Sequence, residues 1–269
     1  LDGRAASKRL RQLMGCDCFD FPKDETVLQE LVGMVTGNQD IVMDFFAGSG
    51  TTGHAVMLQN QVDGGNRIHI QVQLPEPLDL DSKEQKVAAE FCDELDAPRN
   101  IAELTKERLR RAGSKIKEDN PLFTGDTGFR VFKLDSSNIN AWDPDSEDLE
   151  GTLAAHTEHI KPDRTEDDVL YELLLKRGLD LCVPIEKKEV EEKTIHSIGG
   201  GVLFACLANK LDPTQVEAIA QSMLDWRSEL NPAGDTTCVF RDSAFENDVA
   251  KTNMVAILKQ GGIKNVRSL

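Results

Sequence analysis

The chain has 269 residues, enough for one large or two medium domains, and its 39% hydrophobic and 29% charged residues are typical of a globular protein. No apolar run is long enough to span a bilayer and no basic-then-apolar leader is present, so we expect a cytoplasmic protein without a membrane partner. The net charge of −16 opposes tight, non-specific binding to phosphate backbones, so any main contact with nucleic acid should lie elsewhere.

The first 135 residues alternate between strand-like and helix-like patterns. Short apolar runs bounded by turn residues predict strands, and apolar residues at helical spacing predict helices. We predict strands at 40–46, 67–77 and 126–135, and helices at 3–15, 27–35, 52–60 and 100–116. Residues 79–98 are acidic and variable in pattern. This order of elements favours an α/β fold with a parallel, doubly wound sheet.

A polar, acidic segment at 136–160, which contains Pro144, is interpreted as a linker. Beyond it the sequence predicts a second group of elements. These are helices at 165–178, 212–224 and 247–262, a strand at 236–242, and a hairpin over 187–207 that turns at Gly199, Gly200 and Gly201. The expected organisation is a domain at 1–135 and a smaller α/β domain at 161–269.

The stretch "DFFAGSGTT" at 44–52 joins a strand to a helix through glycines at 48 and 50, and Gly53 completes a GxGxxG pattern. Glycines let the backbone approach a ligand, and a helix start presents unpaired N–H groups to an anion. Three interpretations are open: a tight structural turn, a dinucleotide site and a site for a methyl donor such as S-adenosylmethionine. A phosphate-binding loop is excluded, because no lysine follows Gly53 directly.

Asp44 favours the methyl donor. The amino-acid end of S-adenosylmethionine carries a carboxylate, which suits the loop N–H groups, and an ammonium, which needs an acceptor. Asp44 stands at the end of the strand, where it can supply that acceptor. Dinucleotide fingerprints do not usually carry a carboxylate just before the first glycine.

The loop with its surroundings resembles a known family. "DFFAGSGTTGHAV" followed by "DGGNRIHIQVQLPEP" is similar to the cofactor segment of amino-methyltransferases that act on adenine in DNA. More narrowly, it resembles the modification (Mod) subunit of type III restriction–modification systems, with "FDFPK", "NIAELTKERLRRAG", "VLYELLLKRGLDL" and "FRDSAFENDVAKTNMVAILKQ" in the family's order. The resemblance implies a Rossmann-like S-adenosylmethionine-dependent methyltransferase fold, in part, and a C-terminal α/β domain.

Carried over by position, the resemblance implies which residues bind the cofactor. Those that border the methionine end of the donor are Phe21, Pro22 and Lys23. Those that surround its amino-acid moiety are Asp44, Phe45, Phe46, Ala47, Gly48, Ser49, Gly50, Thr51 and Thr52. Gln73 is the counterpart of the carboxylate that binds the ribose hydroxyls, with Glu76 as a substitute. Asp24 departs from the pattern, since many relatives have a second proline there, which leaves the shape of that segment open.

The catalytic group of this family is missing. Methyl transfer to an adenine amine requires a group that accepts the amine's hydrogen bonds and an aromatic residue that stacks the extruded base. The resemblance implies that an Asp-Pro-Pro-Tyr tetrapeptide supplies both. No such tetrapeptide occurs, "DPDS" at 143–146 lacks an aromatic residue, and Tyr171 reads as a helix packing residue. With Leu1 in place of a starting methionine, we expect the C-terminal portion of a longer subunit, inactive alone, whose DNA-recognition region lies upstream.

The resemblance also implies partners: double-stranded DNA through the upstream region, a restriction (Res) subunit and a second modification subunit. Basic residues at Lys8, Arg9 and Arg11, and at Arg108, Arg110 and Arg111, could touch DNA or form solvated helix faces. Two other functions stay open. The chain could be a nicotinamide- or flavin-binding domain, or a non-enzymatic assembly module with a vestigial pocket.

No metal site is expected. Cys16 and Cys18 are the only closely spaced cysteines, and a single such pair lacks the second pair that a zinc site needs. The five histidines form no HExxH-type cluster. We expect the thiols to be reduced.

Overall fold

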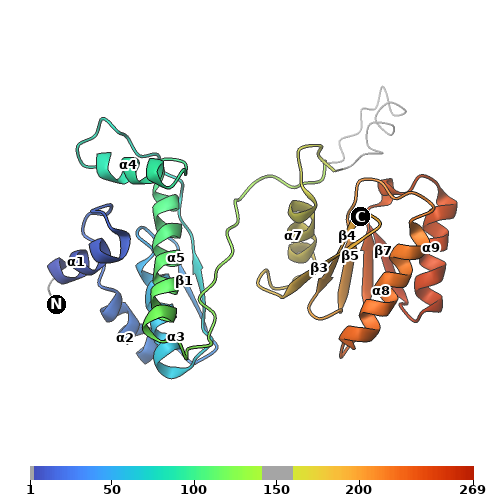
Figure 1. Cartoon of the computed structure of the whole chain (residues 1–269), viewed down its shortest axis with the longest axis horizontal. Helices are drawn as coiled ribbons and strands as arrows, with labels where there is room; N and C mark the ends of the chain where they lie inside the picture. The colour runs from blue at the N-terminus through green and yellow to red at the C-terminus, as the bar shows by residue number, and fades with distance from the viewer. Residues whose placement is uncertain (1–2, 141–159) are drawn as a thin grey trace. The chain divides into compact units, whose positions relative to one another are not determined.

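The computed structural model describes residues 3–140 and 160–269, which form two compact units that divide between Val131 and Phe132 (Figure 1). Each unit contains both helices and strands, so the chain is a mixed helix and sheet protein. None of the helices in the described ranges combines the length and the apolar character that a membrane crossing requires.

The segment expected to be a linker, 136–160, falls mostly outside the described residues, and so does Pro144. Its first residues contact α7 (Glu166–Lys176) of the second unit. Ser137 Oγ donates to Glu172 Oε1 at 2.6 Å, and the Asn138 amide donates to Glu172 Oε2 at 2.7 Å. Residues 137 and 138 are therefore fixed to the second unit.

The first unit is built around one strand–helix–strand motif. β1 (Ile41–Asp44) and β2 (Ile68–Gln71) pair in parallel, as the sequence predicts, and α3 (Thr51–Asp63) connects them. Four more helices surround the motif: α1 (Gly3–Met14), α2 (Glu25–Val35), α4 (Lys86–Glu94) and α5 (Ile101–Asp119). Both α2 and α5 pack against α3 (Figure 1).

Helix α4 lies in the acidic stretch 79–98, for which the sequence predicts no element. Its buried side chains join an apolar cluster with α1 and α5, formed by Leu10, Met14, Cys18, Ala88, Phe91, Cys92 and Leu104. A helix of nine residues is too short to be stable from propensity alone. Packing against its neighbours therefore determines it.

Residues 126–135 form no strand, so the prediction of a third strand is wrong. Thr127 is buried against Gly113 of α5, and Phe129 packs on an apolar cluster around Leu109. The alternation in this segment reflects contact with a helix. A strand also needs a neighbouring strand for its backbone hydrogen bonds, and the described sheet of this unit consists of β1 and β2. The doubly wound sheet is thus reduced to a single β–α–β motif.

One face of the β1–β2 pair is covered by α3, and the other face is exposed. Successive strand residues point to opposite faces, so residues two apart share a side. The exposed apolar residues in and just after these strands are Ile41, Met43, Phe45, Ile70, Val72 and Leu74, and Ile41 is 61% exposed. We call this set the open face. A contiguous apolar surface of this kind marks a site of interaction.

The second unit contains a five-stranded sheet in the order β3-β4-β5-β6-β7. The antiparallel part consists of β3 (Ile185–Val190), β4 (Lys193–Ile198) and β5 (Leu203–Cys206). The parallel part continues from β5 through β6 (Thr237–Phe240) to β7 (Asn265–Ser268). The connections include α8 (Val216–Leu230), a 3-10 turn η1 (Asp242–Ala244) and α9 (Asp248–Gln260).

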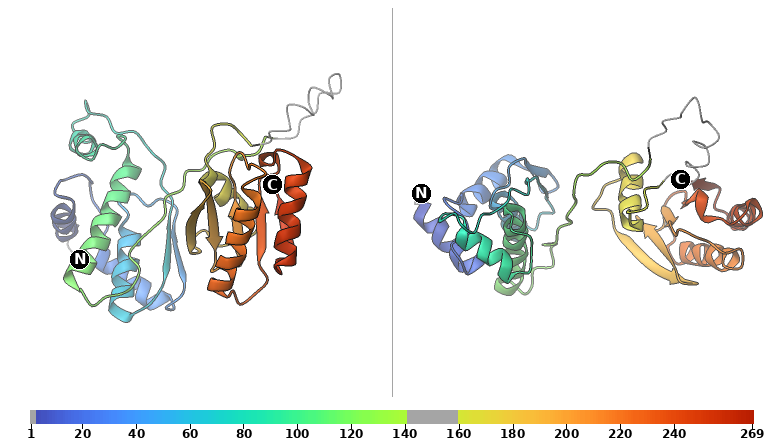
Figure 2. Two further views of the ribbon diagram at one scale, coloured as in Figure 1. Left: turned by 45° about the vertical axis from the view of Figure 1, so that its right-hand side comes forward. Right: turned by 90° about the horizontal axis from the view of Figure 1, so that it is seen from above.

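Helices cover both faces of this sheet. Phe204 and Cys206 of β5 point into the core beneath α8 and α9, whereas Leu203 and Ala205 point into the core beneath α7. Figure 2 shows α7 on one side of the sheet and α8 with α9 on the other. Because both faces are buried, β5 is a continuous apolar run, as is typical of a central strand.

The predicted hairpin at 187–207 is part of a three-stranded meander. β4 and β5 turn at residues 199–201, where all three glycines have positive φ, as the sequence predicts. A second turn at Glu191 and Glu192 joins β3 to β4, with φ of 50° and 61°. Glutamate rarely adopts positive φ, so no local signal marks this turn.

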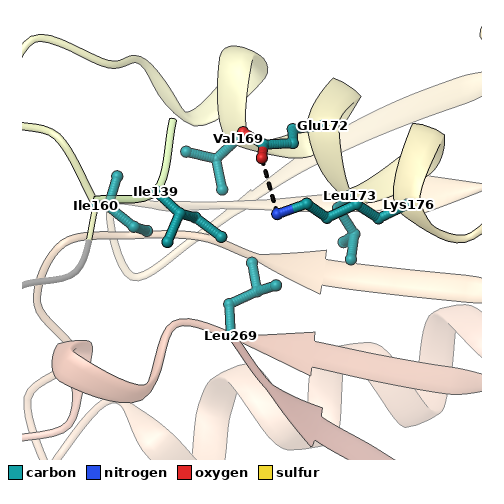
Figure 3. Close-up of a pocket in the computed structure, with 7 residues that line it drawn as sticks. All are labelled: Ile139, Ile160, Val169, Glu172, Leu173, Lys176 and Leu269. Atoms are coloured by element: carbon teal, nitrogen blue, oxygen red, sulfur yellow. Dashed lines mark ion pairs between the residues drawn. The ribbon is translucent and has the colours of Figure 1, made fainter. Parts of the chain in front are cut away.

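A small apolar cavity lies beneath α7 (Figure 3). Its volume is about 10 Å³, close to the space of one water probe, so it does not hold an organic ligand. The Glu172–Lys176 ion pair spans its rim, with 2.8 Å between Lys176 Nζ and Glu172 Oε1. The second unit therefore contributes no ligand site here.

Cys16 and Cys18 are joined by a disulfide in the loop after α1, where the sequence predicts reduced thiols. Their Cα atoms lie 5.4 Å apart, within the range that a disulfide bridges. The conformation of the loop sets this Cα–Cα distance, so the spacing of the two cysteines in the sequence does not predict it.

Candidate cofactor site

The glycine loop runs from the end of β1 to the first residue of α3. Gly48 and Gly50 have φ of 50° and 74°, in the left-handed region that other residues rarely adopt. A Cβ at Gly50 would also lie 3.1 Å from Thr105 of α5. Both the backbone conformation and the close approach of α5 therefore require glycine at position 50.

Asp44 lies over this loop. Its Oδ1 accepts a hydrogen bond from the Phe46 amide at 3.1 Å, and its Oδ2 accepts one from Thr52 Oγ1 at 2.6 Å. Both oxygens thus face the loop and the helix start, and a carboxylate oxygen can accept further bonds. The structure brings Asp44 and Thr52 together, as the sequence predicts for one site.

Gln73, two residues after β2, contacts the same loop. Its Oε1 accepts a hydrogen bond from the Gly48 amide at 2.7 Å. The amides of Phe46, Ala47 and Gly50 are also paired, so the N–H groups left for a ligand are those at the start of α3. Glu76 is exposed, and its backbone carbonyl accepts a bond from Ile101 at the start of α5. Gln73 is therefore part of the loop's own network, whereas Glu76 contacts the start of α5 through its backbone.

The segment 21–23 precedes α2. Phe21 has a φ of 48° and is 93% exposed, Pro22 is half-buried, and Lys23 is exposed. Asp24 caps the helix, because its side chain accepts a hydrogen bond from the Thr26 amide at 3.0 Å. The residue that departs from the family pattern therefore starts α2 and fixes the direction in which the segment enters it.

Two residues of α5 hold the loop from behind, and the sequence analysis missed both. Thr105 Oγ1 donates to Gly48 O at 2.5 Å, and Arg108 Nη1 donates to Thr51 Oγ1 at 2.7 Å. Arg108 is 1% exposed, so it forms neither a DNA contact nor a solvated face. Its position four residues after Leu104 and four before Ala112, on the apolar side of α5, is the signal that could have indicated burial.

Comparisons with known proteins show which family the glycine loop and its surroundings resemble. Residues 3–63, which include the segment 21–23 and the glycine loop, match the DNA methylase family. The chain is 31% identical to the Mod subunit of the type III restriction–modification enzyme EcoP15I of Escherichia coli, over 92% of this chain and 35% of that protein. Over most of its length, the chain is therefore similar to the modification subunits of type III restriction–modification systems.

A second family member, the StyLTI Mod subunit of Salmonella typhimurium, is 32% identical over 58% of this chain and 24% of that protein. The type II methyltransferase M.KpnI of Klebsiella pneumoniae is 33% identical over 27% of this chain and 18% of that protein. The chain thus spans between about a quarter and about a third of the length of the Mod subunits that it matches here.

The catalytic tetrapeptide of the family is not in the sequence, and "DPDS" at 143–146 lies outside the described residues. Tyr171 packs edge-to-face on Phe132, with ring centroids 4.9 Å apart, so it is a packing residue of α7. No group of three potential metal ligands occurs within residues 3–140 and 160–269.

His54 makes the first unit sensitive to acid. Burial in α3, with Arg108 and Arg9 nearby, lowers the pKa of His54 from 6.5 to about 3. The unfolded chain therefore binds a proton below pH 6.5 that the folded chain excludes until pH approaches 3. The stability from this group is complete above pH 6.5 and is lost as the pH falls.

We expect His54→Gln to flatten this loss. Between pH 6.5 and 4.5, the parent chain should lose about 1 kcal/mol more unfolding free energy per pH unit than the variant. Urea unfolding at several pH values measures the difference. Parallel curves between pH 7 and 8 are the control, and parallel curves below pH 6.5 would contradict the assignment.

Proposed function

We propose that this chain carries the S-adenosylmethionine-binding part of an adenine-N6 DNA methyltransferase, the modification subunit of a type III system. The observation that carries the proposal is the Asp44 carboxylate over the glycine loop, with both oxygens on the loop side. An acceptor for the donor's ammonium and N–H groups for its carboxylate then lie at one strand end. This is the pairing that an amino acid needs.

Within this proposal, the residues from Asp44 to Thr52 surround the amino-acid moiety of the donor, and the segment 21–23 borders its methionine end. Gln73 binds the ribose hydroxyls, or Glu76 does so. Since the Gln73 side chain is bonded to Gly48, donor binding requires it to share or release that amide. The fold of the first unit is then part of a Rossmann-like methyltransferase sheet, within a domain at 1–135 that precedes a small domain at 161–269.

The proposal assigns the chemical step to groups outside this sequence. An Asp-Pro-Pro-Tyr motif and a DNA-recognition region are needed for methyl transfer and base extrusion. The open face supports the need for further structure, because six apolar side chains there would be covered by added strands or helices. Double-stranded DNA, a restriction subunit and a second modification subunit are the proposed partners.

One observation favours a different function. The Gly48 amide is already paired with Gln73, as it would be in an assembly module whose pocket is vestigial. Calorimetric titration of the chain with S-adenosylmethionine and with NAD separates the candidates. Heat with S-adenosylmethionine alone supports the proposal, and heat with NAD alone supports a dinucleotide domain. Binding of neither ligand, with a dimer in sedimentation, supports the assembly module.

Asp44→Asn is expected to weaken S-adenosylmethionine binding by about 1.5–3 kcal/mol, roughly ten- to 150-fold in Kd, because the charge that pairs with the ammonium is removed. Asparagine keeps an oxygen for the Phe46 amide. Asp40→Asn is the matched control, since Asp40 lies just before the same strand and accepts from the Gly37 amide at 2.8 Å. Equal Kd values for the two variants would refute the role of Asp44.

A further inference from the structure

A buried charged network lies behind the glycine loop. The Arg108 side chain, 1% exposed, donates from Nη1 to Ser49 Oγ at 2.8 Å, to Ser49 O at 3.2 Å and to Thr51 Oγ1 at 2.7 Å. One guanidinium nitrogen therefore bonds the two residues that flank Gly50 at the start of α3. Arginine suits this position because its planar group can bond several acceptors in a fixed geometry.

The same guanidinium faces Glu25 of α2. Arg108 Nη2 lies 3.8 Å from Glu25 Oε2, a charge contact without a hydrogen bond, and the Glu25 side chain is 6% exposed. Arg9 of α1 donates from Nε to Glu25 Oε1 at 2.5 Å. Glu25 is the first residue of α2 and directly follows its cap, Asp24, which also pairs with Arg9. Asp24 and Glu25, the two residues that follow the segment 21–23, thus contact α1, and Glu25 also contacts α5.

The network connects two parts of the chain that are distant in sequence. Its path runs from Glu25, two residues after the segment 21–23, through Arg108 to Ser49 and Thr51 of the glycine loop. A charge in this position is difficult to leave unpaired, since neither Arg108 nor Glu25 can reach water freely. The two ends of the network therefore have to move together.

We propose that Arg108 and Glu25 are positioning residues that set the segment 21–23 and the glycine loop relative to each other. Neither needs to touch the donor. This inference rests on the proposed function, which makes these two segments the walls of one donor site. It adds that a single buried ion pair, on α2 and α5, holds both walls.

A purely structural role is the alternative, and Arg67 provides the comparison. Arg67 is also buried and bridges several elements, through Thr36, Asn38, Asn60 and Asp63. Arg67 lies just before the first residue of β2, next to the start of the parallel strand β1. The glycine loop follows the last residue of β1, at the opposite end of the strand pair. A variant of Arg67 should weaken the fold without reaching the proposed donor site.

The test compares the parent chain with Arg108→Gln, Glu25→Gln, the double variant and Arg67→Gln, each first shown to be folded by circular dichroism. Hydrogen exchange followed by mass spectrometry needs no ligand. We expect Arg108→Gln to speed exchange in both 21–26 and 45–52, and Arg67→Gln to speed it in 36–40 and 60–68 alone. Exchange that changes in only one of the first two segments, or in neither, overturns the inference.

Donor affinity is the second readout. Arg108→Gln and Glu25→Gln should each raise the Kd for S-adenosylmethionine about tenfold, within the range for coupling through buried networks, and the double variant should be no worse. Arg67→Gln should leave the Kd unchanged. Equal effects of Arg67→Gln and Arg108→Gln overturn the inference. If the parent chain does not bind the donor, the proposed function fails, and exchange alone decides whether the coupling exists.

If Arg108→Gln does not fold, Arg108→Lys replaces it, and hydrogen exchange in 21–26 and 45–52 decides the outcome in the same way.

Discussion

Replacing Arg67 by methionine is expected to lower the unfolding free energy of the first unit by about 3–5 kcal/mol. The Arg67 side chain is 2% exposed and donates hydrogen bonds to Thr36 Oγ1 at 2.7 Å and to Asp63 Oδ1 at 3.0 Å. Methionine fills a similar apolar volume but supplies no donor. Thr36 Oγ1 and the Thr36 carbonyl then lose their donor, whereas Asp63 keeps its hydrogen bonds from the Gln59 side chain and the Gly65 amide. Denaturant unfolding followed by circular dichroism measures the loss.

The Asp63 carboxyl provides a second readout. Its hydrogen bond from Arg67 lowers the pKa of Asp63 from 3.8 to about 2, so the variant should show a pKa closer to 3.8 in an NMR titration. Arg99→Met is the control, because Arg99 is largely exposed and bonds to Asp93 at 2.7 Å. Its effect should stay within about 0.5 kcal/mol. An unchanged unfolding free energy for Arg67→Met would show that the hydrogen bonds of Arg67 do not stabilise the packing of α2, α3 and β2.

Replacing Phe204 by alanine is expected to destabilise the second unit by about 3–5 kcal/mol. Phe204 is fully buried at the centre of β5, and its ring lies 5.5 Å from that of Trp226 on α8. The lost ring leaves a cavity where the sheet meets α8, and a close-packed core cannot fill it completely. Denaturant unfolding followed by tryptophan fluorescence, to which buried Trp226 contributes together with Trp142, measures the loss.

Val249→Ala is the control for this prediction. Val249 lies on α9 and is 68% exposed, so its truncation should change the stability of the second unit by less than about 0.5 kcal/mol. A loss below about 1 kcal/mol for Phe204→Ala would mean that the site collapses around the smaller side chain. The role of Phe204 as the centre of this core would then be wrong.

Helices could be predicted well where local chemistry sets their ends. Thr165 and Asp168 form a reciprocal cap at the start of α7, and Gly178 follows its end with a φ of 67°. Asn100 and Asn247 cap α5 and α9 in the same local way. These interactions join residues three positions apart, so the sequence displays them directly.

Elements that depend on distant partners could not be predicted. The alternation in 126–135 suggests a strand. Thr127 and Phe129 instead pack beside α5, Phe132 packs on Tyr171 of α7, and no strand in the described ranges pairs with this segment. β7 forms because β6 provides a parallel partner for its backbone, with Asn265 opposite Thr237. A strand exists only with its neighbour, and a sequence pattern does not say whether the neighbour is there.

The glycine loop and its carboxylate were determined by the sequence alone. Positive φ at Gly48 and Gly50 needs glycine, and Asp44 reaches Phe46 and Thr52 over two and eight residues. What only the tertiary structure decided is the support of that loop. Arg108, 59 residues from Ser49, is carried by α5 into a buried position beside the loop. Its place on the apolar side of α5 indicates burial, but not which acceptors it meets. The physical reason is that burial of a charge depends on acceptors brought close by folding, and those acceptors belong to other elements.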